Sequence, residues 1–381
     1  MRSTALTARL GRILGILFSI CFVTGLLSHY QYSPWSWLPQ PASPVWGYRL
    51  SQGLHVATGT ASIPLLLVKL WSVYPNLFRW PPARSVKQAL ERASVAVLVA
   101  TALVQVFTGF LNTLNWYPWP WDFVSVHRFL GYVLIGSILL HVAVKLPDIK
   151  YGLQSKVADG DVLTEIPWSE NPLAHSNAGP LPPPPTPALS RRGLLAATGA
   201  GVGVVVVTSV GQTLRPLEPL GLLAIRQPKK GPQGVPVNKT ADQARVTVLA
   251  ADPAWVLRVV GPAPYSLTLA EVVAMAVHED HFPVNCVEGW SAGAQWRGLR
   301  LLDVVTRAGG TAESRVRVMS LERQGKFNSS YVEGPQVSAA LLATHINGER
   351  LNVDHGYPIR LIAPNRAGVL NTKWLTTIEV I

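Results

Sequence analysis

The stretch VSVHRFLGYVLIGSILLHVAV, residues 124–144, carries a single charged residue, Arg128, and two histidines, His127 and His141. A helix that crosses a membrane needs about 20 consecutive, predominantly apolar residues. Four further stretches meet this requirement, at about residues 10–28, 50–71, 93–114 and 193–214. The sequence therefore predicts five transmembrane helices in a multi-domain membrane protein.

The composition of the chain agrees with membrane insertion. Only 14% of the 381 residues are charged, whereas a soluble domain usually has about 25%. Hydrophobic residues make up 48% of the chain, which excludes intrinsic disorder because disorder requires low hydrophobicity and high net charge. A single water-soluble domain and a disordered chain are both excluded.

The basic residues are concentrated in the segments that orient the predicted helices. The net charge is +12, from 33 Lys and Arg against 21 Asp and Glu. Basic residues before the first stretch, between the second and third, and after the fourth are Arg2, Arg9, Arg12, Arg79, Arg84, Lys87, Arg92, Lys145, Lys150, Lys156, Arg191 and Arg192. Such residues favour the cytoplasmic side, so we expect a cytoplasmic N-terminus and an extracytoplasmic C-terminal domain in the cell membrane. We expect a lipid bilayer, and not a nucleic acid, as the partner of this charge.

The apolar stretches and the polar segments between them divide the chain into five segments. They are a four-helix transmembrane domain at 1–146, a cytoplasmic Pro-rich linker at 147–192, the fifth helix at 193–214, a second linker at 215–235 and an extracytoplasmic domain at 236–381. The first linker contains LPPPPTP, which favours an extended spacer. It ends in Ser190-Arg191-Arg192, which resembles a twin-arginine export signal for folded proteins or is simply the basic flank of a helix.

Histidines inside the apolar stretches are candidates for function, because an ionisable residue in a bilayer is costly. His127 and His141 are separated by close to four helical turns, at about 100° per residue, so both face one way. His55 lies near the outer end of its stretch, at a depth that matches His127. Histidine is a common axial ligand of haem iron, so we expect His55 and His127 to hold one haem between two helices. Hydrogen bonding within the bundle is the alternative.

The C-terminal segment has the pattern of an ordinary soluble domain. Arg245–Leu249 and Trp255–Val260 alternate as strands do, and Leu269–Val277 and Leu299–Ala308 indicate short helices. The chain has two cysteines, and Cys286 cannot pair with Cys21 inside the first apolar stretch. Cys286 is either a buried hydrophobe or a thiolate ligand for a transition metal.

The four apolar stretches of the first segment resemble the di-haem cytochrome b subunits of formate dehydrogenases and nickel–iron hydrogenases, and their cytochrome b561-like relatives. The resemblance lies in Thr24-Gly25, HVATG at 55–59, Thr108-Gly109, and HRFLGY at 127–132 followed by His141. It implies b-type haem at His55 and His127, and a second haem at His141. The second ligand of that inner haem would come from early in the first stretch, where this sequence has Gly11 and Arg12.

The last segment resembles the molybdopterin domain of the sulfite oxidase family, which includes bacterial methionine-sulfoxide reductase. The motifs that carry the resemblance, in chain order, are WVLRVVG at 255–261, CVEGWS at 286–291, WRGLRLLD at 296–303, NGE at 347–349, DHGYPIR at 354–360 and Lys373-Trp374. It implies a mixed α+β domain that binds molybdenum–molybdopterin, with Cys286 as the catalytic metal ligand.

The same resemblance implies the cofactor contacts. His355, Arg360 and Lys373 match positions near the cofactor, and Asn238 and Lys239 match an early polar loop. From the residues alone, Arg360 could equally be a surface charge, and Trp374 fits a core position better than a cofactor contact. The sulfite oxidase tyrosine has no clear equivalent, since Phe327 and Tyr331 flank its expected place.

Together these features predict a membrane-bound molybdenum oxidoreductase that exchanges electrons with the quinone pool through b-type haem. We favour a reductase of small S-oxides or N-oxides outside the cytoplasm. A quinone-reducing dehydrogenase of a small sulfur compound such as sulfite is one alternative. A membrane cytochrome b with a cofactor-free outer binding module is another.

Overall fold

The computed structural model describes residues 4–35, 37–78, 80, 85–154, 191–210, 215–224, 226 and 229–381. These residues form two compact units. One comprises Met1–Phe22 and Ala57–Val207, and the other comprises Val23–Val56 and Thr208–Ile381. Helices α1 (Thr4–Tyr32) and α2 (Gly47–Leu77) contribute residues to both units.

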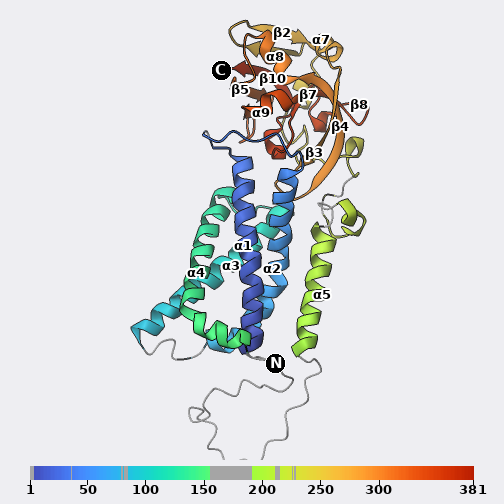
Figure 1. Ribbon diagram of the computed structural model, residues 1–381. Coiled ribbons are helices and arrows are strands. Elements are labelled where there is room, and N and C mark those ends of the chain that lie inside the picture. Colours follow the sequence, from blue (N-terminus) through green and yellow to red (C-terminus); the bar gives the residue numbers. More distant parts are fainter. Residues whose placement is uncertain are drawn as a thin grey trace, which may run out of the picture. The chain divides into compact units, whose positions relative to one another are not determined.

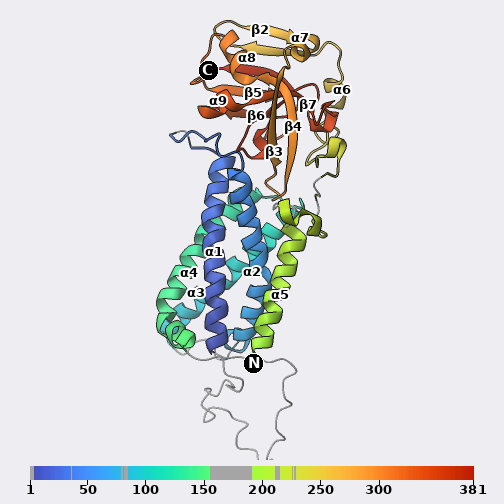
Figure 2. The ribbon, with the colours of Figure 1, turned by 45° about the vertical axis from the view of Figure 1, so that its right-hand side comes forward.

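Five helices are long and apolar enough to cross a membrane, as the sequence predicted. Besides α1 and α2 they are α3 (Val86–Thr113), α4 (Phe123–Gln154) and α5 (Arg191–Val210), and all five are visible in Figures 1 and 2. Helix α4 continues through Pro147, so the first residues of the predicted linker are helical. The rest of that linker, from 155 to 190, lies outside the described residues, as do the side chains of Arg191 and Arg192.

Leucines on neighbouring helices form the buried core of the first unit. They are Leu6, Leu10 and Leu14 of α1, Leu65 and Leu66 of α2, and Leu134 of α4, with Ala102 of α3 between them. Large apolar side chains also point away from this core: Phe129 and Leu139 of α4 are each 65% exposed. In a soluble bundle these outer positions would be polar, so this exposed apolar surface is that of helices solvated by lipid.

The C-terminal domain is a mixed α+β domain with two five-stranded sheets, labelled in Figures 1 and 2. The first sheet has the order β2-β1-β10-β5-β6, with β1 and β10 parallel and its other pairs antiparallel. The second has the order β3-β4-β7-β8, with β9 also paired to β7. The strands are β1 (Val256–Val260), β2 (Tyr265–Thr268), β3 (His278–Asn285), β4 (Ser291–Arg300), β5 (Val316–Ser320), β6 (Ser329–Val332), β7 (Leu341–Ile346), β8 (Glu349–Arg350), β9 (Arg360–Ile362) and β10 (Leu375–Val380).

Short helices connect these strands. They are α6 (Thr247–Ala250), α7 (Leu269–Ala274), α8 (Leu301–Arg307) and α9 (Pro335–Ala339). The predicted strand at 256–260 and the two predicted helices are confirmed, but the strand predicted at 245–249 is wrong. That segment is α6, where Val246 is buried and Val248 is 83% exposed. Alternation over five residues does not distinguish a half-buried strand from a single helical turn.

Two hydrophobic clusters hold the domain together. One joins Leu257 and Val259 of β1 to Val304 and Val305 of α8. The other lies on the second sheet around Trp296, whose indole N–H donates to the carbonyl of Phe282 at 3.0 Å. Val235 belongs to this second cluster, so the packed domain includes the end of the predicted second linker. The clusters fix the ends of β3, β4 and β9, from which the residues of the candidate site project.

Candidate functional site

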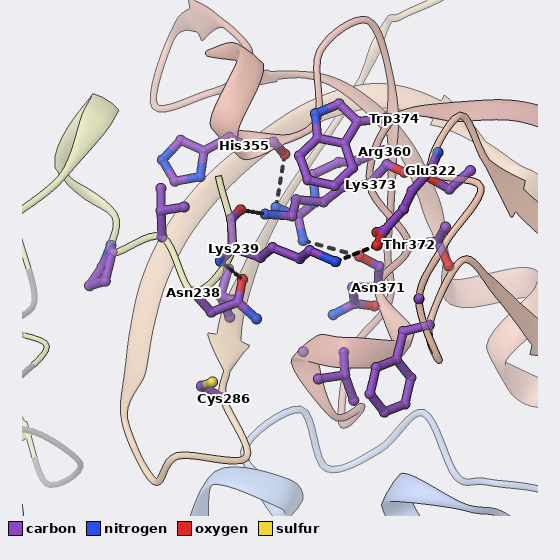
Figure 3. A pocket seen from close by; sticks show the side chains of 18 of the residues that line it. Asn238, Lys239, Cys286, Glu322, His355, Arg360, Asn371, Thr372, Lys373 and Trp374 are labelled. Atoms are coloured by element: carbon purple, nitrogen blue, oxygen red, sulfur yellow. Dashed lines mark hydrogen bonds and ion pairs between the residues drawn. The ribbon is translucent and has the colours of Figure 1, made fainter. Parts of the chain in front are cut away.

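A pocket in the C-terminal domain collects every cofactor contact predicted for that domain. It has an empty volume of about 810 Å³, including the solvent at its mouth. The predicted residues among its lining are Asn238, Lys239, Cys286, His355, Arg360 and Lys373. In Figure 3 the Cys286 sulfur lies at one end, and His355, Arg360 and Lys373 gather toward the other.

Cys286 is the first residue of the loop that joins β3 to β4. Its backbone N–H donates to the carbonyl of Trp290 at 2.9 Å, which closes the hairpin. Gly289 has a φ of +94°, a left-handed conformation that glycine adopts without strain. Gly368 passes close to this loop: a Cβ there would lie 2.6 Å from the carbonyl oxygen of Asn285. The backbone itself therefore holds the thiol at the pocket.

The Cys286 thiol is buried, with 2% of the residue exposed. Burial raises the pKa of this thiol well above its ordinary value, and the nearby Glu288 carboxylate raises it further. A thiolate at this position therefore needs a cation beside it, and a transition metal is such a cation. The described residues contain no group of three or more His, Cys, Asp or Glu that could hold a metal ion. A metal at Cys286 would need its other ligands from a cofactor.

Two buried cations occupy the other end of the pocket. The Arg360 guanidinium donates to the carbonyls of His355 at 3.0 Å and Asn371 at 3.3 Å. The Lys373 ammonium donates to the carbonyls of Lys239 at 2.5 Å and Asp354 at 3.0 Å. Within the described part of the chain neither side chain forms an ion pair. Burial lowers the pKa of Arg360 to about 10 and that of Lys373 to about 7.

These cations fit an anionic group. A buried charge is normally paired, because leaving water costs several kcal/mol per ion, roughly. Among the described residues, the hydrogen bonds of Arg360 and Lys373 all go to backbone carbonyls, so an anion such as a phosphate would supply a directly paired charge. Arg360 is 4% exposed, so the alternative of a surface charge is wrong. Trp374 is buried as the sequence suggested, and it also lines the pocket.

His355 is a neutral group at physiological pH. Burial lowers its pKa to about 4, and the charges of Arg360 and Lys373 act in the same direction. Its Nε2 is 2.7 Å from the carbonyl oxygen of Pro232, which can only accept, so Nε2 carries the proton. The adjacent Gly356, at φ +108°, leaves no room for a side chain, because a Cβ there would lie 3.0 Å from the Cβ of Arg360.

Asn238 and Lys239, the predicted polar loop, also line the pocket, but the charge of Lys239 is paired, unlike those of Arg360 and Lys373. Lys239 forms an ion pair with Glu322, so its charge is already compensated. Asn238 accepts a hydrogen bond from the backbone N–H of Lys239 at 2.9 Å. Lys239 therefore offers a cofactor less net charge than Lys373 does.

Sequence reasoning missed several polar residues of the pocket, among them Glu322 and Asn371. Asn371 is 2% exposed, and its side-chain Nδ2 has no hydrogen-bond partner. A buried donor without a partner costs about 1–3 kcal/mol unless a ligand satisfies it. Neither residue stands in a motif, and Glu322 lies in a stretch, LERQGK, that has the composition of a surface loop. The unpaired donor is further support for a polar ligand in this pocket.

The histidines of the long helices lie against glycines. A Cβ at Gly25 of α1 would lie 2.9 Å from the Cε1 of His55. On α4, His127 has its Nδ1 3.1 Å from the Thr108 hydroxyl, and a Cβ at Gly109 would lie 3.3 Å from its Cε1. A metal-bound histidine usually hydrogen-bonds through its second ring nitrogen in this way. The pairing of His55 with His127 stays a prediction, because the two residues belong to different units.

His141 also lies on α4, and the position expected for its partner contains a lysine ammonium. A Cβ at Gly11 would lie 3.1 Å from the Nζ of Lys69, which donates to the carbonyl of Thr7 at 2.5 Å. The predicted inner haem would therefore have His141 as one ligand, and the described part of α1 has no histidine at the position of Gly11. It stays a prediction with an incomplete ligand set.

Comparison with known proteins agrees with this site. Residues 244–381 match the family model described as oxidoreductase molybdopterin binding domain. An uncharacterized oxidoreductase, YuiH, of Bacillus subtilis is 30% identical over 33% of this chain and 64% of its own length. Mitochondrial sulfite oxidase of Drosophila melanogaster is 32% identical over 30% of this chain and 23% of its own.

Two further similarities extend the comparison. The catalytic subunit MsrP of a protein-methionine-sulfoxide reductase from Xanthomonas axonopodis is 29% identical over 38% of this chain and 50% of its own. The solved structure of the sulfane dehydrogenase SoxCD from Paracoccus pantotrophus aligns with 18% identity and a TM-score of 0.31, over 34% of this chain and 38% of its own. This chain therefore covers less than two thirds of each of these relatives. Residues 244–381 therefore resemble an oxidoreductase molybdopterin binding domain, and this segment is similar to sulfite oxidase.

Proposed function

We propose that this chain is a membrane-bound oxidoreductase in which a molybdenum–molybdopterin centre at Cys286 exchanges electrons with membrane quinone through b-type haem at His55 and His127. One observation carries the molybdenum part of the proposal. The buried Cys286 thiol shares a pocket with Arg360 and Lys373, two buried cations without an ion-pair partner among the described residues. A thiolate for a metal and cations for an anion are the two groups that this cofactor requires.

The polar residues of the pocket would bind different parts of the cofactor. When bound, a molybdenum centre supplies two-electron oxygen-atom transfer. Cys286 would hold the metal through its Sγ, and its proton would leave when the metal binds. Arg360 and Lys373 would neutralise the phosphate, while Asn371 would donate from its Nδ2. His355 donates its Nε2 proton to the carbonyl of Pro232, so its Nδ1 can accept a hydrogen bond from a cofactor N–H.

The rest of the lining would keep water away from the reacting atoms. Val284, Trp290 and Val369 line the same pocket as Cys286. An apolar wall lowers the local dielectric and strengthens the interaction of Arg360 and Lys373 with an anion. Trp290 is itself held, since its indole N–H donates to Glu288 at 2.9 Å.

The haem part of the proposal is supported by the glycines that face His55 and His127. Each histidine ring lies beside a glycine of a neighbouring helix, Gly25 for His55 and Gly109 for His127. The Thr108 hydroxyl would fix the orientation of the His127 ring from its Nδ1 side. A helical bundle that binds haem builds its site from such inward-facing side chains.

Metal analysis and an optical spectrum of the purified full-length protein test both cofactors together. We expect molybdenum and a reduced b-type α band in the wild type. Cys286→Ser should lose molybdenum-dependent activity and keep the α band, whereas the His55→Ala, His127→Ala double variant should lose the α band and keep molybdenum. Full activity and molybdenum content in Cys286→Ser would refute the assignment of the metal ligand.

The direction of electron flow is a separate question. We favour a reductase, so a quinol analogue should be oxidised when dimethyl sulfoxide is added. Rapid reduction of a quinone analogue by sulfite, with no reaction of dimethyl sulfoxide, would instead identify the dehydrogenase. A protein with haem but neither molybdenum nor molybdopterin would be a cytochrome with a cofactor-free outer module.

A further inference from the structure

Asn365 joins the α1–α2 connection to the C-terminal domain inside one compact unit. Its side-chain Oδ1 accepts from the Gln31 amide at 2.8 Å and from the backbone N–H of Tyr48 at 2.6 Å. Its Nδ2 donates to the carbonyl of Pro41 at 2.9 Å, and its own carbonyl accepts from Gln40 at 2.9 Å. Asn365 is 2% exposed, and buried hydrogen bonds of this kind favour one arrangement of the groups that they join.

A second contact lies directly beside Cys286. The Gln52 side chain on α2 donates from its Nε2 to the carbonyl of Val287 at 2.8 Å. The Ser28 hydroxyl on α1 donates to the Oε1 of Gln52 at 2.5 Å, which orients the amide so that its NH₂ faces Val287. Gln52 is 7% exposed, so this hydrogen bond is shielded from water.

The loop that begins at Cys286 and joins β3 to β4 also contacts α2, through Gly289. A Cβ at Gly289 would lie 2.7 Å from the Cγ2 of Val56, so only a glycine lets the loop approach this closely. Gln52 and Val56 are three residues before and one residue after His55 on the same helix. The helix that carries the proposed haem ligand therefore holds the loop that carries the proposed molybdenum ligand, and both lie in the same compact unit.

We propose that Gln52 is a positioning residue for electron transfer: by binding the Val287 carbonyl, it fixes the Cys286 loop relative to His55 so that electrons pass between the two centres within one chain. This inference rests on the proposed function. In the reductive direction, one quinol and one S-oxide become one quinone, one sulfide and one water. The quinol supplies the two electrons and two protons, and the electrons pass from the His55 side to the Cys286 side one at a time.

The physical reason for a fixed contact is geometric. The rate of electron transfer falls steeply as the distance between the two centres grows. One shielded hydrogen bond, from Gln52 to Val287, and one close contact, between Gly289 and Val56, hold the loop and keep this distance constant. Gln52 touches neither proposed centre, so its effect should appear in the internal transfer and not in the affinity for either cofactor.

The test uses the full-length protein in detergent and needs no substrate. A photoreduced flavin injects one electron, and the internal transfer phase is followed in the haem absorbance. Gln52→Met keeps the length of the side chain but cannot donate to Val287. We expect the internal phase to be slower in this variant than in the wild type. Ser28→Ala, which frees the amide to rotate, should give a smaller change in the same direction.

Four further readouts separate positioning from a general structural defect. The haem potential, the α band and the molybdenum content should match those of the wild type in Gln52→Met, while hydrogen exchange of the amides at 286–290 should become faster. Gln154→Met, at the exposed end of α4, is the matched control and should change none of these quantities. The internal phase should also be independent of protein concentration, as a transfer within one chain requires.

The outcomes are distinguishable. An unchanged internal phase in Gln52→Met would overturn the inference, and so would loss of molybdenum or haem in that variant, since Gln52 would then be merely structural. Absence of molybdenum or of the α band in the wild type would instead refute the proposed function before any variant is measured.

Discussion

Replacement of Lys373 by methionine should stabilise the cofactor-free protein at neutral pH while it abolishes cofactor binding. The Lys373 ammonium is largely buried and has only the carbonyls of Lys239 and Asp354 as hydrogen-bond partners. Burial, followed by the charge of Arg360, lowers its pKa from 10.5 to about 7. Because the unfolded chain keeps the ordinary pKa, the unfolded state binds a proton between pH 7 and 10.5 that the folded state does not. The stability of the wild type therefore rises with pH across this interval.

The size of the effect follows from that pKa. The free energy of unfolding should rise by at most about 1.4 kcal/mol per pH unit within the interval, which is about 3 kcal/mol from pH 7 to 9.5. Relaxation and water penetration reduce such values, so we expect about 1–2 kcal/mol. For a domain of this size that corresponds to a Tm change of roughly 2–8 °C.

The assay compares thermal unfolding of the wild type and Lys373→Met at pH 7 and 9.5, with both proteins produced in a host that cannot make molybdopterin. The difference in Tm between pH 9.5 and pH 7 should be larger for the wild type than for the variant, by roughly 2–8 °C. With the cofactor bound, its anionic group should restore the charged ammonium, so the extra pH dependence should disappear. Equal pH dependence in the two cofactor-free proteins would refute the reasoning that this cation is buried without compensation.

Three other perturbations follow from the structure. Gly109→Val should remove the haem α band, because the added Cβ would lie 3.3 Å from the His127 ring. Gly15→Val is the control and should keep the band, since a Cβ at Gly15 meets nothing within 4 Å, and equal spectra of the two variants would contradict the haem placement. Trp296→Ala should lower the free energy of unfolding of the C-terminal domain by about 3–5 kcal/mol, since it empties a fully buried site, and a Tm drop of only a degree or two would argue against that core. Thr268→Ala should cost about 1 kcal/mol, because Thr268 and Glu271 form the capping box of α7; chemical denaturation checks this, with Thr311→Ala in a surface turn as the comparison.

The long helices could be predicted from the sequence because hydropathy and length are local properties. Residues 124–144 contain enough apolar side chains to span a bilayer wherever the rest of the chain lies, and the same holds for the other four helices. The alternation of short runs was less informative. Arg245–Leu249 has the pattern of a strand and forms the single turn α6, since the neighbours that bury Val246 lie elsewhere in the chain.

The candidate residues of the pocket were identified from motifs, but their electrostatic states were not. Lys239 and Lys373 looked equivalent as basic residues near a cofactor. The fold pairs Lys239 with Glu322, 83 residues away, and gives Lys373 only carbonyl partners. Asn371 stands in no motif, and its unpaired amide becomes meaningful only once the pocket around it is formed.

The five apolar helices, the mixed α+β character of the C-terminal domain and Cys286 as a candidate metal ligand could be read from the sequence alone. Only the tertiary structure decided that Cys286 shares a cavity with Arg360 and Lys373, and that Gln52 bonds to Val287, 235 residues further along the chain. The physical reason is the range of the interactions. Apolar length and helical periodicity act between neighbours in the chain, whereas burial, ion pairing and hydrogen bonding between distant segments depend on how the whole unit packs.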